Sequence, residues 1–295
     1  MPLLLMHSVA NQRIAAGPGS PSGGLPRMSG AGVSRRCLMS RTSAQTPAAA
    51  QVLALPRPAA PAAIDFTQLQ GLLFDIDGTL CNSDPLHFQA FQELLVAQGF
   101  NAGAPISEEF FRLHISGRHN PEIALDLFPD QSEEWRTAFY TKKEQRYREL
   151  AGGSLQRLPG LSRMMAWVES RGLRRVAVTN APRANAQLML DALGMQTWFE
   201  AVVLGEECTR PKPFPDPYLV GLQQLELQGQ GQRALVLEDS PAGVQAAVAA
   251  GIPVLGLTTG QSAETLVEAG AVAVVSDFNG VMDLIETAQG PHAAR

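Results

Sequence analysis

The chain has 295 residues, of which 45% are hydrophobic, and this is enough to bury a sizeable core in one large or two ordinary domains. Its formal net charge is −5, but residues 1–64 carry six arginines and no Asp, Glu or Lys, so residues 65–295 have a net charge of −11. An acidic body argues against a nucleic-acid partner, and the longest apolar runs, such as 271–275, are far shorter than the ~18 residues of a membrane span.

Residues 1–64 are rich in Ala, Ser, Pro and Gly and have no sustained helical or alternating apolar period. Such a segment cannot bury enough apolar surface to offset its conformational entropy, so we expect it to be disordered. A composition rich in Arg and Ser and free of acids is typical of an organelle transit peptide. We expect a chloroplast rather than a mitochondrion as the destination. The alternative is a low-complexity extension that carries no targeting signal, and the protein would then be cytoplasmic.

From residue 64 onward, short apolar runs alternate with segments of helical length. Because hydrophobicity within the runs is continuous, we expect strands that are covered on both faces. Strands alternating with helices predict an α/β fold, Rossmann-like and doubly wound, with a mostly parallel sheet. Gly172, Gly194, Gly251 and Gly270 each follow a helical segment, where a left-handed closing residue is expected. The runs lie at 71–75, 174–179, 201–204, 233–238, 253–257 and 271–275, and the helical segments at 160–171, 183–193, 215–225, 240–250 and 262–269.

Residues 84–151 interrupt this alternation, because they contain helical patterns only. Ser107, followed by Glu108 and Glu109, is a typical helix start with acids in the first turn. An interval of about 70 residues is too long for a loop in a compact domain. We therefore predict a small helical cap at 84–151, inserted into a catalytic core formed by 65–83 and 152–295. The helical segments of the cap lie at 84–98, 107–116, 120–127 and 131–150.

Two carboxylates follow the first predicted strand, in the sequence Asp-Ile-Asp-Gly-Thr at 75–79. Asp75 and Asp77 are two positions apart, so both side chains leave an extended chain on the same side, and Gly78 permits a sharp turn. Ligands of open α/β sheets gather at the carboxyl ends of strands, and two acids there suit Mg²⁺, which prefers oxygen ligands. A calcium loop or a solvated turn is the alternative, but the glycine and glutamate that a calcium loop needs at its sixth and twelfth positions are missing.

Polar residues also mark the ends of the next three strands. Thr179 and Asn180 end the second strand, Lys212 follows the third between two prolines, and Glu238 and Asp239 end the fourth. Each has an ordinary explanation on its own, as a turn, a solvated lysine or a helix cap. Their occurrence in this order at successive strand ends predicts one shared site.

These motifs resemble those of the haloacid dehalogenase-like hydrolase superfamily, and the resemblance runs from about residue 66 to about residue 286. The all-helical insertion after the first strand is similar to the first cap type of that family. The segments at 73–87, 117–124 and 178–182 are similar to the plant and algal sugar- and glycerol-phosphate phosphatases called Sgpp, whose near cousins are the beta-phosphoglucomutases. The resemblance implies an enzyme that hydrolyses phosphoric monoesters.

The resemblance also implies a role for each carboxylate. Asp75 would be the nucleophile that forms an aspartyl-phosphate. Asp77 would protonate the leaving alcohol and then take a proton from the attacking water. An acid at this position separates phosphatases from the dehalogenase branch. Asp75, the backbone carbonyl of Asp77 and Asp239 would hold Mg²⁺, with Glu238 mainly behind them.

The remaining motif residues would bind the phosphoryl group. Thr179 and Asn180 would donate hydrogen bonds to its oxygens, and Lys212 would add a fixed positive charge over the nucleophile. The resemblance thus implies Mg²⁺ as the cofactor, a small phosphorylated metabolite as the partner, and a monomer.

The cap would select the substrate, because the core motifs bind only the phosphoryl group. Gly117 would serve as a hinge for approach to the core. Arg118 would bind a second anionic or hydroxylated part of the substrate through its planar guanidinium. The alternative is a surface arginine that pairs with Glu122 one turn on.

His87 is the second cap residue of interest, because it stands twelve residues after Asp75 and could contact Asp77 and steady its proton transfers. The alternative is a histidine that only packs. We expect His114 and His119 to be structural, and Trp135, Phe139 and Tyr147 to form the core of the cap.

The three cysteines, Cys37, Cys81 and Cys208, lie far apart and contain no C-x-x-C pattern. This argues against a disulfide framework and a zinc site and favours a reducing compartment. Cys81 and Cys208 lie near the motifs but have no basic neighbour that would activate a thiolate.

Three functions are weighed. The first is a phosphomonoesterase for small phosphosugars or glycerol phosphate. The second is a beta-phosphoglucomutase-like phosphosugar mutase, which shares Asp75, Asp77 and the metal but needs a cap that excludes water and clamps a second phosphate. The third is a regulatory or structural domain that has lost catalysis, and the presence of Asp75, Asp77, Lys212 and Asp239 argues against it. The preferred phosphosugar depends on cap side chains that the sequence does not place in space.

Overall fold

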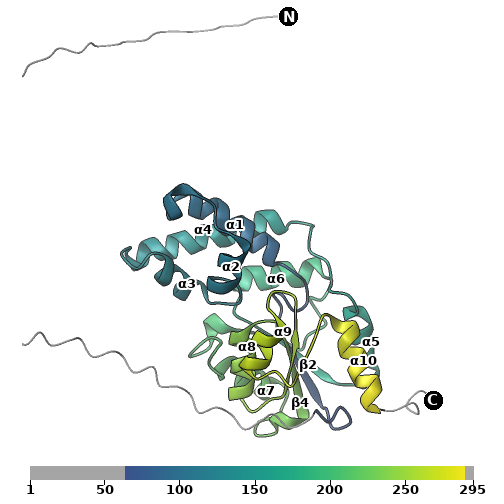
Figure 1. Ribbon diagram of the computed structural model, residues 1–295. Coiled ribbons are helices and arrows are strands. Elements are labelled where there is room, and N and C mark those ends of the chain that lie inside the picture. Colours follow the sequence, from purple (N-terminus) through teal and green to yellow (C-terminus); the bar gives the residue numbers. More distant parts are fainter. Residues whose placement is uncertain (1–63, 290–295) are drawn as a thin grey trace, which may run out of the picture. The chain divides into compact units, whose positions relative to one another are not determined.

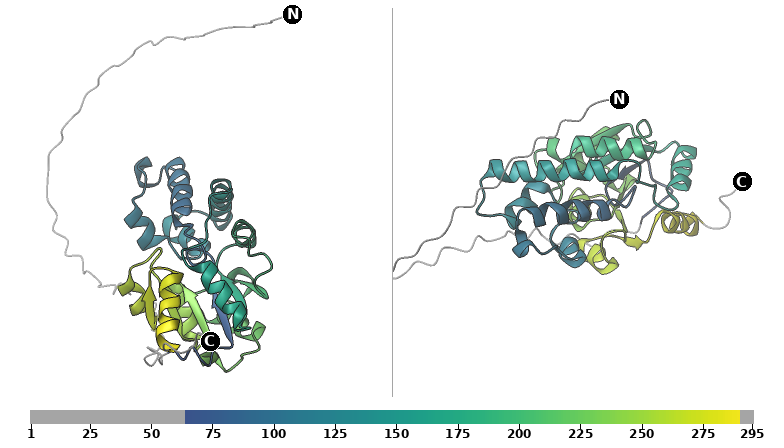
Figure 2. Two further views of the ribbon diagram at one scale, coloured as in Figure 1. Left: turned by 90° about the vertical axis from the view of Figure 1, so that its right-hand side faces the viewer. Right: turned by 90° about the horizontal axis from the view of Figure 1, so that it is seen from above.

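A computed structural model describes residues 64–289, and Figures 1 and 2 show it from three directions. The predicted transit-peptide-like extension, with its arginines and Cys37, therefore lies outside the described residues apart from Ile64. Within the described part of the chain, no helix is both long enough and apolar enough to cross a membrane.

In residues 64–289 the strands form one parallel six-stranded sheet in the order β3-β2-β1-β4-β5-β6. This order is that of doubly wound Rossmann-like sheets. The predicted fold class is confirmed, and each predicted strand is found within two residues of its expected ends. The strands are β1 (Gly71–Phe74), β2 (Arg174–Thr179), β3 (Ala201–Leu204), β4 (Ala234–Glu238), β5 (Val254–Leu257) and β6 (Ala273–Val275).

β1 occupies the middle of the sheet, hydrogen-bonded to β2 on one side and β4 on the other. All of its residues are buried, because helices cover both faces of a central parallel strand. The register pairs Phe74 with Ala177 of β2 and with Leu237 of β4. The carboxyl ends of these three strands therefore lie at the same edge of the sheet.

Helices cover both faces of the sheet: α7, α8 and α9 pack on one face and α5, α6 and α10 on the other (Figure 1). The glycines predicted to close four helices have φ between 61° and 115°. α10 was not among the predicted helices, although its buried residues recur at helical spacing, at 278, 281, 282 and 285. The bounds are α5 (Leu161–Ser170), α6 (Arg183–Ala192), α7 (Asp216–Gln224), α8 (Pro241–Ala249), α9 (Ala263–Ala269) and α10 (Phe278–Gln289).

The segment between β1 and α5 is helical, as its pattern predicted, with α1 and α4 lying side by side (Figure 2). Ser107 and Ser132 begin two of its helices, because their hydroxyl oxygens accept hydrogen bonds from the backbone N–H groups of Phe110 and Trp135 at 3.1 and 3.2 Å. The division into a core and a cap at residues 84 and 151 stays a prediction. The helices are α1 (Asp84–Ala97), α2 (Glu108–His114), α3 (Asn120–Leu127) and α4 (Glu133–Ala151).

These four helices enclose an apolar cluster of their own, which includes Phe91, Phe111 and Phe139. Trp135 stacks on Phe139 with ring centroids 5.7 Å apart, as expected for packing residues. Tyr147 does not fit the expectation of a cap-core residue, because it belongs to the cluster that packs against the sheet. The physical reason is the length of α4, whose last turns extend from the helical segment to the core.

Candidate active site

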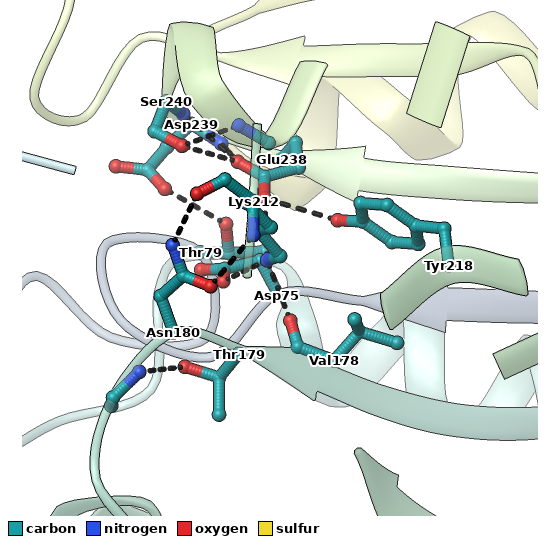
Figure 3. A network of polar contacts seen from close by, with 12 residues as sticks. Asp75, Thr79, Val178, Thr179, Asn180, Lys212, Tyr218, Glu238, Asp239 and Ser240 are labelled. Carbon is teal, nitrogen blue, oxygen red and sulfur yellow. Dashed lines mark hydrogen bonds and ion pairs between the residues drawn. The ribbon is translucent and has the colours of Figure 1, made fainter. Parts of the chain in front are cut away.

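The polar residues predicted for the strand ends come together at the carboxyl edge of β1, β2 and β4 (Figure 3). Asp75 directly follows β1, and its backbone N–H donates to the carbonyl of Leu237 at 3.0 Å. The chain then turns at Gly78, which has a φ of 87°, and a Cβ there would lie 2.1 Å from Oδ2 of Asp239. Glycine is therefore required at this position, because any side chain would collide with the carboxylate of the β4 loop.

Lys212 supplies the positive charge of the site and is only 3% exposed. Its Nζ donates to Oδ1 of Asp75, to the carbonyl of Val178 and to Oε1 of Glu238, each at 2.7 Å. These contacts use all three ammonium hydrogens. Burial alone would lower the pKa of Lys212, but the charges of Asp75 and Glu238 outweigh it and raise the pKa. The lysine is thus charged and fixed between two carboxylates.

The carboxylate of Asp75 uses one oxygen and leaves the other free. Oδ1 accepts from Lys212, whereas the buried Oδ2 accepts no hydrogen bond from any described residue. Burial raises the pKa of Asp75 to about 7; the charge of Lys212 opposes this rise and that of Glu238 adds to it. A buried carboxylate oxygen without a partner is costly. Oδ2 is therefore the atom of this residue that is free to react or to bind a cation.

Glu238 is fully engaged by the surrounding protein. Its Oε1 accepts from Lys212 and, at 3.0 Å, from the hydroxyl of Tyr218. Its Oε2 accepts from the backbone N–H groups of Asp239 and Ser240 and from the Ser240 hydroxyl, each at 3.0 Å. A carboxylate with this many hydrogen bonds holds the loop after β4, and the geometry favours the predicted place of Glu238 behind the metal ligands.

Three buried carboxylates lie close together at this edge of the sheet. Asp75, Glu238 and Asp239 offer oxygen atoms that all lie within 4.8 Å of one another. Burial, reinforced by the neighbouring charge of Asp75, raises the pKa of Asp239 well above its usual value. Mg²⁺ prefers hard oxygen ligands, and a cluster of carboxylates that the nearby cations do not fully neutralise provides them. The residues present therefore fit the predicted ion.

Asp77 lines the same pocket as Asp75, and residues at the start of the helical segment contact both of its carboxylate oxygens. Its Oδ1 accepts a hydrogen bond from the Ser83 hydroxyl, and its Oδ2 lies 2.8 Å from Nε2 of His87. The Nδ1 of His87 lies 3.2 Å from Nζ of Lys143. Because an ammonium group only donates, Nδ1 must accept, and Nε2 carries the proton toward Asp77. The contact of His87 with Asp77 that the sequence suggested is present, whereas Ser83 and Lys143 were missed.

A buried polar network continues from Lys143 into the core. Its Nζ donates to Oε1 of Glu144 at 2.5 Å, and Glu144 also accepts from Nδ2 of Asn120, at 2.6 Å, and from Nδ2 of Asn185 on α6. Burial alone would raise the pKa of Glu144, but the charge of Lys143 and the hydrogen bonds lower it to about 2. This carboxylate is therefore ionised inside the protein.

The sequence contains a pattern that indicates this network. The buried positions of α4 include 139, 143, 147 and 151, which recur every four residues and so form one stripe on the helix. Lys143 stands in that stripe between aromatic residues. A charged residue at a buried position needs a partner, and this requirement points to Lys143.

Thr179 and Asn180 lie at the end of β2 and line the same pocket as Asp75. Asn180 holds the backbone of Lys212: its Oδ1 accepts from the N–H at 3.1 Å and its Nδ2 donates to the carbonyl at 3.0 Å. The Oγ1 of Thr179 accepts from the N–H of Ala181 at 3.0 Å, which leaves the hydroxyl hydrogen free to donate. Their role as phosphate donors stays a prediction, and the sequence did not indicate the positioning role of Asn180.

Arg118 also lines the pocket, but its guanidinium group is engaged elsewhere. It donates to the carbonyl of His114 at 2.9 Å and to Oδ2 of Asp126 at 2.6 Å. The alternative, an exposed arginine that pairs with Glu122, is wrong about the partner. Arg118 lies before α3 begins, so Arg118 and Glu122 are not one helical turn apart.

The segment before α3 contacts the core directly. Gly117 has a φ of 72°, and a Cβ there would lie 2.6 Å from Cβ of Ser240. The neighbouring Ser116 donates its hydroxyl hydrogen to Oδ2 of Asp84 at 2.7 Å. The close approach explains glycine at 117, and its predicted use as a hinge stays a prediction.

Comparisons with known proteins agree with the resemblance drawn from the motifs. The profile of haloacid dehalogenase-like hydrolases matches residues 72–257. A phosphorylated carbohydrates phosphatase of Thermotoga maritima is 29% identical over 213 residues, which cover 70% of this chain and 94% of that protein. The chloroplastic protein SUPPRESSOR OF QUENCHING 1 of Arabidopsis thaliana is 27% identical over 249 residues, covering 82% of this chain and 23% of that protein. The crystal structure of CbbY from Rhodobacter sphaeroides in complex with phosphate superposes with a TM-score of 0.63 at 25% identity, covering 71% of this chain and 95% of that one.

Proposed function

Because this chain belongs to the haloacid dehalogenase-like hydrolase family, we propose that it is a magnesium-dependent phosphomonoesterase that acts through an aspartyl-phosphate intermediate. Its substrates would be small phosphosugars or glycerol phosphate. The relative from Thermotoga maritima, whose name gives phosphorylated carbohydrates as its substrates, supports this class. The CbbY structure with bound phosphate supports a pocket that holds a phosphoryl group.

The observation that carries the proposal is the pairing of Asp75 with Lys212. Lys212 fixes Oδ1 and leaves the buried Oδ2 without a hydrogen-bond partner among the described residues. In the first step Oδ2 would form a bond to phosphorus while the bond from phosphorus to the substrate oxygen breaks. The charge of Lys212 would offset the negative charge that gathers on the phosphoryl oxygens. The Thr179 hydroxyl and the second Nδ2 hydrogen of Asn180 would donate to those oxygens.

Asp77 would move the protons. In its protonated form it would give a proton to the leaving alcohol, and as a carboxylate it would then take one from the water that attacks the aspartyl-phosphate. Ser83 and His87 each hold one of its oxygens and so keep it aligned. The oxygen of that water would bond to phosphorus while the bond between Asp75 and phosphorus breaks. Phosphate would leave, Asp75 would again be a carboxylate, and Asp77 would again be protonated.

Asp75, the backbone carbonyl of Asp77 and Asp239 would hold Mg²⁺, with Glu238 behind them. When bound, the ion would offset the charge of the carboxylates and of the phosphoryl group. The close approach of the carboxylates of Asp75, Glu238 and Asp239 supports this set.

The mutase alternative is less well supported by the pocket. A mutase that works through a bisphosphate needs a clamp for a second phosphate, for which Arg118 was the candidate. The guanidinium of Arg118 is bound by Asp126 and the carbonyl of His114. We therefore place the phosphatase first.

We also propose that the chain acts on its small metabolite as a monomer and that it works in the chloroplast. The arginine-rich, acid-free extension supports an organelle address. The chloroplastic relative supports the chloroplast over the mitochondrion.

The test is phosphate release by the purified full chain, with Mg²⁺ and after chelation. The panel is glycerol 3-phosphate, ribose 5-phosphate, glucose 6-phosphate, fructose 1-phosphate and beta-glucose 1-phosphate, with Asp75→Asn as the inactive control. Magnesium-dependent release of phosphate from several of these, abolished by the substitution, is the expected result. Conversion of beta-glucose 1-phosphate into glucose 6-phosphate with little free phosphate would establish the mutase instead. Phosphate release that persists without the metal or without Asp75 would overturn the mechanism.

A further inference from the structure

The pocket has a second wall beyond the residues assigned to the phosphoryl group. This wall is built by the helical segment and by α6, and it must contact the part of the substrate that leaves as an alcohol. Its charges therefore decide which alcohols fit. The polar residues that line it are Asp84, Arg118, Asn120, Lys143, Glu144 and Asn185.

Each cation that lines the pocket in the described part of the chain already has a carboxylate partner. The shortest N–O distance is 2.7 Å for Lys212, 2.5 Å for Lys143 and 2.6 Å for Arg118. For Lys143 and Arg118, the cations of the second wall, this pairing leaves only a weak attraction for a second anion. The pairs are Lys212 with Asp75 and Glu238, Lys143 with Glu144, and Arg118 with Asp126.

The remaining polar groups of this wall are acidic or neutral. Asp84 is a half-buried carboxylate that accepts a hydrogen bond from the Ser116 hydroxyl, whereas the charge of Glu144 is already offset by Lys143. A second anionic group on the substrate would face the carboxylate of Asp84, and like charges at close range are strongly unfavourable. A hydroxyl group can donate to a carboxylate or amide oxygen and pays no such cost.

We propose that the pocket accepts phosphate monoesters whose remainder is uncharged and hydroxylated and that it rejects esters carrying a second anionic group. Asp126 is a specificity-determining residue in this scheme. It lies outside the pocket and holds the guanidinium of Arg118, the one pocket cation whose partner is exposed. This inference rests on the proposed phosphatase function and names its substrate class.

The first test compares two matched pairs of substrates on the full chain with Mg²⁺. Glycerol 3-phosphate is compared with 3-phosphoglycerate, which replaces one CH₂OH by a carboxylate, and fructose 1-phosphate with fructose 1,6-bisphosphate. We expect kcat/KM to be at least about tenfold higher for the member with the uncharged remainder. Equal or faster hydrolysis of the charged members would overturn the inference and leave the phosphatase standing. Release of no phosphate from any of the four would overturn both.

The second test removes the Asp126 carboxylate that binds the guanidinium of Arg118. In Asp126→Asn, we expect kcat/KM for 3-phosphoglycerate to rise about threefold to fivefold while that for glycerol 3-phosphate is unchanged, the size expected for an exposed ion pair. Arg118→Gln added to Asp126→Asn should cancel the gain, since the two residues act as a pair. Asp130→Asn, which removes another exposed acid near α3, is the matched control and should change neither value. An unchanged preference in Asp126→Asn would remove Asp126 from the specificity of the site.

Discussion

His87 holds Asp77 from a fixed direction: its Nε2 lies 2.8 Å from Oδ2 of Asp77, and its ring stacks on that of Tyr147 with centroids 3.8 Å apart and planes 3° from parallel. The stacking sets the plane of the imidazole, and Lys143 at Nδ1 sets the tautomer. The carboxylate proposed to move protons is therefore oriented by groups that do not themselves need to touch the substrate.

Substituting His87→Phe tests this orientation, because a phenyl ring can still stack on Tyr147 but cannot donate to Asp77. We expect kcat to fall about 10-fold to 100-fold, as for other residues that orient a catalytic group, with a change in KM of less than about threefold. Steady-state kinetics on the best substrate of the panel would measure this. His114→Phe is the control, since His114 is exposed. A larger loss in KM than in kcat would mean that His87 binds substrate instead.

Asp77→Asn separates proton transfer from metal binding. The amide keeps a hydrogen-bonding side chain but cannot act as an acid or a base, so we expect kcat to fall about 10²-fold to 10⁴-fold. Mg²⁺ affinity, measured by calorimetry, should stay close to that of the unmodified chain, because the proposed contact of residue 77 with the ion is through its backbone. A large loss of Mg²⁺ affinity would show that the Asp77 carboxylate is itself a ligand.

Lys212→Met tests how far the site depends on one buried charge. Removing Nζ leaves the carboxylates of Asp75 and Glu238 buried without their cation, and breaking a buried ion pair in this way costs about 3–5 kcal/mol. We expect the free energy of unfolding in the absence of Mg²⁺ to fall by that amount, together with loss of turnover. Lys142→Met is the matched control, because Lys142 is exposed. Loss of turnover with unchanged stability would limit Lys212 to catalysis.

The strand ends could be predicted because their position follows from local sequence. Asp75, Thr179 and Glu238 each end or follow a continuous apolar run, and parallel strands carry their carboxyl ends to one edge. The sheet order then places β2 and β4 on either side of β1. The positions of the strand ends are therefore enough to predict that these residues converge, without knowledge of contacts between distant side chains.

The contacts of the helical segment could not be predicted in the same way, because they join positions that no local pattern relates. Glu144 meets Asn185, 41 residues later in the chain and on the core helix α6. Arg118 meets Asp126 rather than Glu122, because the chain bends at Gly117 before α3 begins. The geometry of such pairs depends on how helices pack, which propensities and motifs do not specify.

The ionised Glu144 makes stability depend on pH, and Glu144→Gln tests it. The pKa of Glu144 is lowered from 4.5 to about 2, because the charge of Lys143 and the hydrogen bonds to Glu144 outweigh burial. A group whose pKa is lowered in the folded state stabilises the protein above its unfolded pKa, and this contribution is lost as pH falls from about 4.5 toward 2. The shift corresponds to roughly 3 kcal/mol at neutral pH.

Denaturant unfolding of both proteins at pH 7 and at pH 3 measures the effect. We expect Glu144→Gln to be less stable than the unmodified chain at pH 7, and the difference to shrink at pH 3, where protonation of Glu144 in the unfolded state has already removed part of its contribution. Glu149→Gln changes an exposed acid on the same helix and should show no such convergence. A difference that is constant between the two pH values would mean that Glu144 stabilises the helical segment through the shape of its side chain, because only a titrating carboxylate makes the cost of its removal depend on pH.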